Sequence, residues 1–152
     1  FASTPAGIWP GRVGSMSGRY RVTKTFDFCY GHRLLQYEGK CRHLHGHNGR
    51  VEVDVSAVGL DTLGMVVDFG DISATLKQWV DANLDHRMLL CRDDPVAGML
   101  GEMGEPLYLM DENPTAENIA RLIFQEGRRA GLNVAEVRLW ETPTGCASYA
   151  ES

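Results

Sequence analysis

The stretch RVEVDVSAV, residues 50–58, decides the fold class because its side chains alternate in character. Val51, Val53 and Val55 share one face, and the residues between them are charged or polar. A period of two residues is typical of a strand with one face buried and the other open. The sequence therefore predicts a strand here whose valine face packs on a core.

A second alternating run lies upstream, at residues 20–29. Val22, Phe26 and Phe28 share one face of this run, and polar residues occupy the other face. The segment between the two strands, residues 30–48, is too rich in histidine and glycine to be core. We therefore predict two strands that bracket a functional loop.

Downstream, the hydrophobic period becomes that of a helix. Four apolar residues recur there at intervals of four: Ile72, Leu76, Val80 and Leu84. This spacing places all four on one face of a helix. We predict a helix over about residues 71–84, with Asp71 as its N-cap.

A second helix is expected to begin at Asn113, with Pro114 in the first turn, where its missing N–H costs nothing. Gly131 is a suitable C-terminal stop for this helix. Beyond it, the sequence predicts a third strand around residues 137–139 and a short fourth strand at residues 146–149.

The expected order is strand, strand, helix, helix, strand, strand. This order predicts an α+β domain in which two helices cover one face of a four-stranded antiparallel sheet. The open edges of such a small sheet favour assembly of several copies. Residues 91–112 have no clear period, and a connection of that length tends to be functional or interfacial. We assign residues 16–152 to the domain and residues 1–15 to an N-terminal extension.

The composition narrows the classes of protein. The chain has 152 residues, 43% of them hydrophobic, and a formal net charge of -5. The acidic balance argues against a nucleic-acid partner, and no apolar run is long enough for a membrane helix. The four cysteines form no CxxC pair, so we expect reduced thiols and a cytoplasmic protein.

The central loop contains a cluster that predicts metal binding. Cys41, His43, His45 and His47 follow one another at steps of two residues, so an extended segment would project all four to one side. His45 and His47 could then bind one ion, with His32 reaching in from the preceding strand. Three imidazoles with a fourth position open are typical of catalytic zinc. Spacing alone leaves a rival ligand set, Cys41 with His45 and His47.

Six motifs of this chain resemble, in order and spacing, those of the 6-pyruvoyl-tetrahydropterin synthase and 6-carboxy-tetrahydropterin synthase family. They are Phe28-Cys-Tyr-Gly-His32, Cys41-Arg-His-Leu-His-Gly-His47, Val67-Asp-Phe69, Leu84-Asp-His86, Asn113-Pro-Thr-Ala-Glu117 and Trp140-Glu-Thr142. The resemblance covers about residues 20–150. It implies a tunnelling fold, or T-fold, in which three subunits close their sheets into a barrel and two trimers form a homohexamer.

The resemblance also implies roles for the loop residues. His32, His45 and His47 would hold one Zn²⁺ per chain, and Cys41 would be a free catalytic thiol. His43 has no assigned role in the family pattern.

Further site residues follow from the other motifs. The resemblance implies that Asp85 and His86, from a neighbouring subunit, form a catalytic proton relay with Cys41. It implies that Glu141 anchors the pterin, since a carboxylate can accept two parallel N–H bonds. Thr115 and Glu117 would be accessory pterin contacts, although both also suit the first turn of a helix.

The implied activity is that of a lyase acting on 7,8-dihydroneopterin triphosphate. The short spacing of three residues between Cys41 and the His45-Gly-His47 run resembles that of carboxy-forming members. We therefore expect 6-carboxy-5,6,7,8-tetrahydropterin, acetaldehyde and triphosphate as products, which would feed 7-deazaguanine and queuosine synthesis. The alternatives are a 6-pyruvoyl-tetrahydropterin synthase and a non-catalytic zinc-binding assembly subunit.

Two features remain open in the sequence. Four cations surround the histidine loop and form either an anion-attracting funnel or a solvated surface: Arg33, Lys40, Arg42 and Arg50. The chain also departs from the family pattern at Cys29 and Tyr30, where small residues are more usual, and this change is expected to reshape the floor of the pocket.

Overall fold

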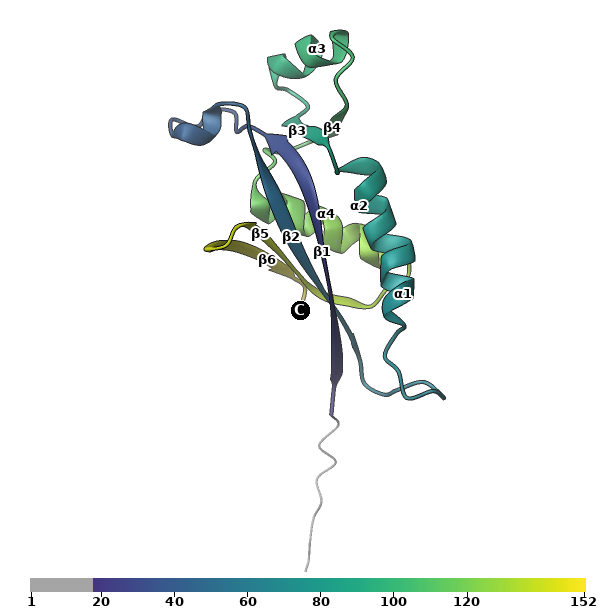
Figure 1. The fold of residues 1–152 in the computed structure, drawn as a ribbon. Helices are drawn as coiled ribbons and strands as arrows, with labels where there is room; N and C mark the ends of the chain where they lie inside the picture. Colours follow the sequence, from purple (N-terminus) through teal and green to yellow (C-terminus); the bar gives the residue numbers. More distant parts are fainter. Residues whose placement is uncertain (1–17) are drawn as a thin grey trace, which may run out of the picture.

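The computed structural model describes residues 18–152, so the predicted extension 1–15 lies outside the described residues. The chain folds into an α+β domain around one mixed sheet, and this confirms the predicted fold class. The strand order is β4-β3-β1-β2-β5-β6 (Figure 1). The strands are β1 (Tyr20–His32), β2 (His45–Ala57), β3 (Arg87–Cys91), β4 (Leu107–Met110), β5 (Val134–Thr142) and β6 (Gly145–Ala150).

The two long strands, β1 and β2, pair antiparallel along their whole length. Their alternation is the predicted one, since Val51 and Val53 are fully buried and Phe28 is 3% exposed. Both strands extend further into the predicted loop than the sequence indicated, and β1 ends at His32 directly opposite His45. The functional residues therefore lie on the ends of rigid strands.

The first helical segment is continuous and consists of α1 (Phe69–Ile72), the π-helical turn η2 (Ser73–Lys77) and α2 (Gln78–Asn83). Its predicted N-cap was wrong. Asp68, rather than Asp71, accepts a hydrogen bond from the Gly70 amide. The earlier cap lets the helix begin two residues sooner, while the predicted apolar face remains buried.

The second predicted helix is α4 (Ala116–Arg129), which begins three residues later than expected. Thr115 is its N-cap and accepts a hydrogen bond from the Asn118 amide at 3.2 Å. Asn113 and Pro114 precede this cap, which leaves their polar groups available to the histidine loop.

The sheet has two strands more than the four predicted, and these two make it mixed rather than purely antiparallel. β3 runs parallel to β1, and β4 runs parallel to β3. β4 and α3 (Pro95–Glu102) occupy much of residues 91–112, where no period was recognised, and β3 directly precedes them. The run Met-Leu-Leu-Cys at 88–91 is apolar throughout, as expected of a buried parallel strand, and therefore shows no alternation.

The core lies between the sheet and the two main helical segments. Residues of α4 such as Ile123 and Phe124 pack with Ile72 and Val80 against the valine face of β2. Figure 1 shows α4 running behind the strands, with α1 and α2 along their side and α3 beyond β3 and β4. Among residues 18–152, no helix has the length and apolar character needed to cross a membrane.

Candidate functional site

The pairing of β1 with β2 brings three histidines together at one end of the sheet. His32 is the last residue of β1, and His45 and His47 are the first and third residues of β2. All three side chains lie on the same face of the sheet. One ring nitrogen from each lies within 4.8 Å of the other two. The strands thus form the cluster that the sequence predicted.

Backbone carbonyl groups orient two of the three rings. Nδ1 of His32 lies 2.7 Å from the Pro114 carbonyl, and Nδ1 of His45 lies 2.7 Å from the His43 carbonyl. A carbonyl only accepts, so each Nδ1 carries the proton and each Nε2 presents a lone pair. Burial lowers the pKa of His32, although the Pro114 carbonyl and Glu141 act in the opposite sense, and this favours the neutral ring.

The free nitrogens then face one another. Nε2 of His32 lies 3.0 Å from Nε2 of His45, and Nε2 of His47 is buried with no hydrogen-bond partner in the described part of the chain. Converging lone pairs repel one another unless a cation lies among them. Neutral imidazoles whose second nitrogen donates to a carbonyl are typical metal ligands. The donor set therefore fits a divalent metal ion.

Cys41 does not join this group, because the segment from Cys41 to His47 is not extended throughout, which was the condition for all four side chains to share one side. Residues Lys40–Arg42 form a short 3₁₀ helix, η1, and the extended strand begins only at His45. The structure therefore does not favour the rival ligand set that included the thiol. Cys41 is half-buried and its sulfur is free.

Glu141 lies beside the histidines, near the end of β5. Its Oε1 lies 3.7 Å from Nε2 of His32, and its Oε2 lies 3.9 Å from Nε2 of His47. The Tyr30 hydroxyl donates a 2.8 Å hydrogen bond to Oε1. Burial, together with the charge of Glu141 and this hydrogen bond, raises the pKa of Tyr30, so the phenol keeps its proton and acts as the donor.

Asp85 and His86 form the predicted pair at the end of α2. Nδ1 of His86 lies 2.8 Å from Oδ2 of Asp85, and Oδ1 of Asp85 accepts the Cys29 amide at 2.8 Å. Burial raises the pKa of Asp85, but the hydrogen bonds from Cys29 and His86 outweigh this effect and the pKa is lowered overall. The carboxylate is therefore ionised and can orient the imidazole. His86 adopts a positive φ of 56°, so the two neighbouring side chains meet outside regular helix geometry.

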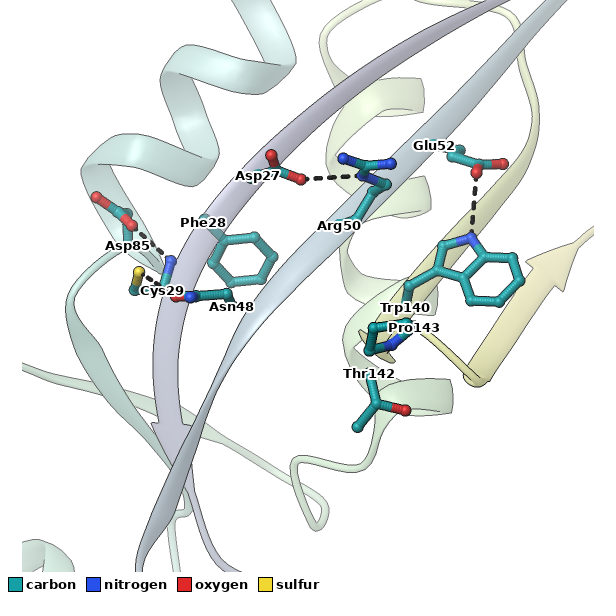
Figure 2. A pocket seen from close by; sticks show the side chains of 10 residues that line it. All are labelled: Asp27, Phe28, Cys29, Asn48, Arg50, Glu52, Asp85, Trp140, Thr142 and Pro143. Atoms are coloured by element: carbon teal, nitrogen blue, oxygen red, sulfur yellow. Dashed lines mark hydrogen bonds and ion pairs between the residues drawn. The ribbon is translucent and has the colours of Figure 1, made fainter.

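Two cavities flank the end of the β1–β2 pair. One, of about 660 Å³, is lined by His45, His47 and His86 together with Leu100 of α3 and Met103 just after it. The other, of about 730 Å³, is shown in Figure 2. There, Asp85 lies beside β1 and accepts the Cys29 amide, and the Cys29 thiol lies 2.8 Å from Oδ1 of Asn48. Among the residues described, Cys41 lines neither cavity.

The motif Asn113-Pro-Thr-Ala-Glu117 supports the histidine loop. The Asn113 side chain accepts the Leu35 amide at 2.9 Å and donates to the Leu35 carbonyl at 3.0 Å. Pro114 orients His32, as described above, while Thr115 caps α4 and Glu117 lies in its first turn. Thr115 and Glu117 thus have local structural roles, and sequence reasoning missed the supporting roles of Asn113 and Pro114.

The four cations around the loop do not act alike. Arg33 forms a two-pronged ion pair with the buried Asp94, with Nε 2.7 Å from Oδ2, and this pair lowers the pKa of Asp94. Arg50 pairs with Asp27 at 3.3 Å on an exposed surface. Lys40 and Arg42 belong to η1. Arg33 and Arg50 therefore already have carboxylate partners.

Comparison with known proteins identifies the family. The sequence model of the 6-pyruvoyl tetrahydropterin synthase family matches residues 21–152. The chain belongs to this family. This confirms the resemblance stated above and the prediction that the chain is an enzyme of this type.

Relatives of the family give more detail. A protein of Rickettsia felis named 6-carboxy-5,6,7,8-tetrahydropterin synthase is 40% identical over 130 residues, which cover 81% of this chain and 94% of the relative. A protein of Haemophilus influenzae with the same name is 32% identical over 141 residues, which cover 87% of this chain and 99% of the relative.

Solved structures share the fold of this chain. An uncharacterised protein from Wolinella succinogenes superposes with a TM-score of 0.76 at 29% identity, covering 90% of this chain and all of that chain. The 6-pyruvoyl tetrahydropterin synthase of Caenorhabditis elegans superposes with a TM-score of 0.66 at 22% identity, covering 89% and 97% of the two chains. The T-fold expected for the single chain is thereby confirmed.

Proposed function

We propose that this chain is a zinc-dependent 6-carboxy-5,6,7,8-tetrahydropterin synthase. It would convert 7,8-dihydroneopterin triphosphate and water to 6-carboxy-5,6,7,8-tetrahydropterin, acetaldehyde and triphosphate. The observation that carries this proposal is the convergence of three imidazole side chains beside the Glu141 carboxylate. The names of the Rickettsia and Haemophilus relatives support the choice of reaction.

His32, His45 and His47 would hold the metal ion. Zinc suits three neutral imidazoles with an open position, and when bound it would polarise oxygen atoms of the substrate's side chain. Glu141 would accept N–H groups from the pterin ring and so orient the substrate at this site. Thr115 and Glu117 are proposed as accessory contacts at the start of α4.

Proton transfer is assigned to Cys41 and to the Asp85–His86 pair. In this proposal, Asp85 keeps His86 oriented through the hydrogen bond between them, and Cys41 exchanges protons with the substrate's side chain. The cavity that contains His86 lacks Cys41 among its described lining residues. This separation supports a site shared between subunits, in which Cys41 of one subunit meets Asp85 and His86 of another, and the assembly we propose is a homohexamer.

Two other functions remain as alternatives. A 6-pyruvoyl-tetrahydropterin synthase would eliminate triphosphate from the same substrate without losing carbon. A non-catalytic zinc-binding assembly subunit would keep the fold and the metal but not the turnover. The four free thiols support a reducing compartment, and we propose the cytoplasm.

Metal-dependent release of triphosphate tests the proposal. The protein would be stripped with a chelator, reloaded with zinc and incubated with 7,8-dihydroneopterin triphosphate. We expect triphosphate only from the reloaded protein, and none from a reloaded Cys41→Ser variant. A zinc-loaded wild-type hexamer that releases no triphosphate would support the non-catalytic alternative instead.

A further inference from the structure

Tyr30 is a buried side chain that connects the core to the metal site. It is 3% exposed, and its ring stacks on Phe28 with centroids 4.9 Å apart. It also contacts the rings of His32 and His47, at centroid distances of 5.3 and 5.7 Å. Because close-packed neighbours hold the ring, packing fixes the position of its hydroxyl.

Gly49 on β2 makes room for this ring. A Cβ atom at residue 49 would lie 2.9 Å from Cε1 of Tyr30 and 3.1 Å from Cδ1 of Leu139. The missing side chain therefore lets Tyr30 on β1 reach across β2 toward β5. Glycine at this position and tyrosine at residue 30 form a matched pair.

Glu141 receives the hydroxyl of Tyr30 on β5. The hydrogen bond is 2.8 Å long and ends on Oε1. Within residues 18–152, the ion-pair contacts of Glu141 are to His32 and His47, and none is to a lysine or an arginine. Tyr30 is thus the neutral donor that orients a carboxylate whose charge faces two of the three histidines.

We infer that Tyr30 is a positioning residue that holds the Glu141 carboxylate against the histidine cluster and thereby strengthens metal binding there. This inference rests on the metal site of the proposed function. It concerns the free protein, before any substrate is bound.

The negative charge of Glu141 is the physical reason why this side chain should strengthen metal binding. Three neutral imidazoles place no negative charge beside a dication, whereas Glu141 adds one at a distance of 3.7–3.9 Å from two ligand nitrogens. A hydrogen bond to an ionised acceptor is short and strong, so the phenol can keep the carboxylate in one orientation. Groups that orient and tune metal ligands in this way typically change metal affinity by about 10- to 100-fold.

The test is a double-mutant cycle on zinc affinity, with Tyr30→Phe, Glu141→Gln and the combined variant. Zinc affinity of the whole protein would be measured by competition with a chelating dye, which requires no turnover. Tyr108→Phe is the matched control. Tyr108 is partly buried and its ring packs against Trp79. It lies in β4, which is separated from β1 by β3. Urea unfolding of each metal-free variant would show that the fold is retained.

We expect Tyr30→Phe and Glu141→Gln each to weaken zinc binding by about 10-fold. The double variant should bind about as well as Glu141→Gln alone, since Tyr30 acts on the metal only through the Glu141 carboxylate, which that variant already lacks. Tyr108→Phe should bind zinc like the wild type. A role for Tyr30 in packing alone would not produce this non-additivity with Glu141.

Wild-type affinity in Tyr30→Phe, or fully additive losses in the double variant, would overturn the inference. If Tyr30→Phe does not fold, Glu141→Gln still decides, because unchanged zinc affinity in that variant removes the proposed effect of the carboxylate. If instead the proposed metal site itself were wrong, the His45→Ala variant would bind zinc as well as the wild type does.

Discussion

His32 and His45 face each other across the β1–β2 pair with their Nε2 atoms 3.0 Å apart, while both of their Nδ1 atoms already contact carbonyl groups. Neither Nε2 has a proton to donate to the other. The two strands, which pair over all of their residues, hold these nitrogens together. This geometry favours a bound cation and leads to the first prediction.

Replacing His45 by alanine should remove the metal, because it deletes one of three converging ligands. Cys41→Ala should retain about one zinc per chain, because the thiol lies on η1, outside the cluster. Metal analysis of both purified variants measures this. Loss of zinc from Cys41→Ala with retention in His45→Ala would reverse the roles assigned to the two residues.

Two inactive variants should complement each other if the proposed active site is shared between subunits. Cys41→Ala and His86→Ala are each expected to be inactive as pure oligomers. Oligomers assembled from an equal mixture should recover about a quarter of wild-type activity, since each site then draws Cys41 and His86 from different chains at random. No recovery, in mixed oligomers verified by mass, would place both residues of a working site in one chain.

The long strands and their buried faces could be predicted from the sequence because alternation is a local signal. Val51 and Val53 lie where the period of two places them. Tyr30 was also accessible to this reasoning, since it stands two residues before His32 and so shares its face. The hydrogen bond of Tyr30 to Glu141 could not be predicted from the sequence, because the two residues lie 111 positions apart in the chain.

Other features depended on distant partners. β4 has only four residues and pairs parallel to β3, so no local pattern distinguishes it from a loop. The even spacing of Cys41 and His45 predicted a shared face only if the segment was extended. The turn at Lys40–Arg42 breaks that condition. The support that Pro114 gives to His32 likewise spans 82 residues of sequence.

Asp54 should stabilise the fold in a pH-dependent way. Its side chain is 3% exposed, and it accepts 2.9 Å hydrogen bonds from both terminal nitrogens of Arg138. Burial raises its pKa, but the hydrogen bonds from Arg138 and Thr23 outweigh burial and lower it overall. Asp54→Asn should therefore cost roughly 3 kcal/mol of unfolding free energy at pH 7, because Arg138 loses a buried partner.

The sign of the pH effect follows from that lowered pKa. The contribution of Asp54 is complete above its unfolded pKa of about 3.9 and is lost as the pH falls through the folded pKa. The difference between wild type and Asp54→Asn in urea unfolding should thus shrink below about pH 4. The exposed Asp27, which pairs with Arg50, provides the control, and Asp27→Asn should cost less than about 1 kcal/mol. A difference for Asp54→Asn that stays constant down to pH 3 would contradict this account.

Gly49→Ala should destabilise the protein because the new methyl group meets the Tyr30 ring and Leu139. Overpacking of this kind costs about 1–3 kcal/mol. Gly59→Ala is the control, since nothing lies within 4 Å of a Cβ atom there. Thermal or urea unfolding of the metal-free proteins compares the two variants. Equal stability of Gly49→Ala and Gly59→Ala would show that the β1–β2 packing tolerates the added methyl group.

The central claim is that this chain forms 6-carboxy-5,6,7,8-tetrahydropterin, and identification of its products tests that claim most directly. The zinc-loaded protein would be incubated with 7,8-dihydroneopterin triphosphate, and the pterin and any aldehyde would be identified by mass. The account predicts the 6-carboxy pterin together with an equal amount of acetaldehyde. Accumulation of 6-pyruvoyl-tetrahydropterin without acetaldehyde would contradict it.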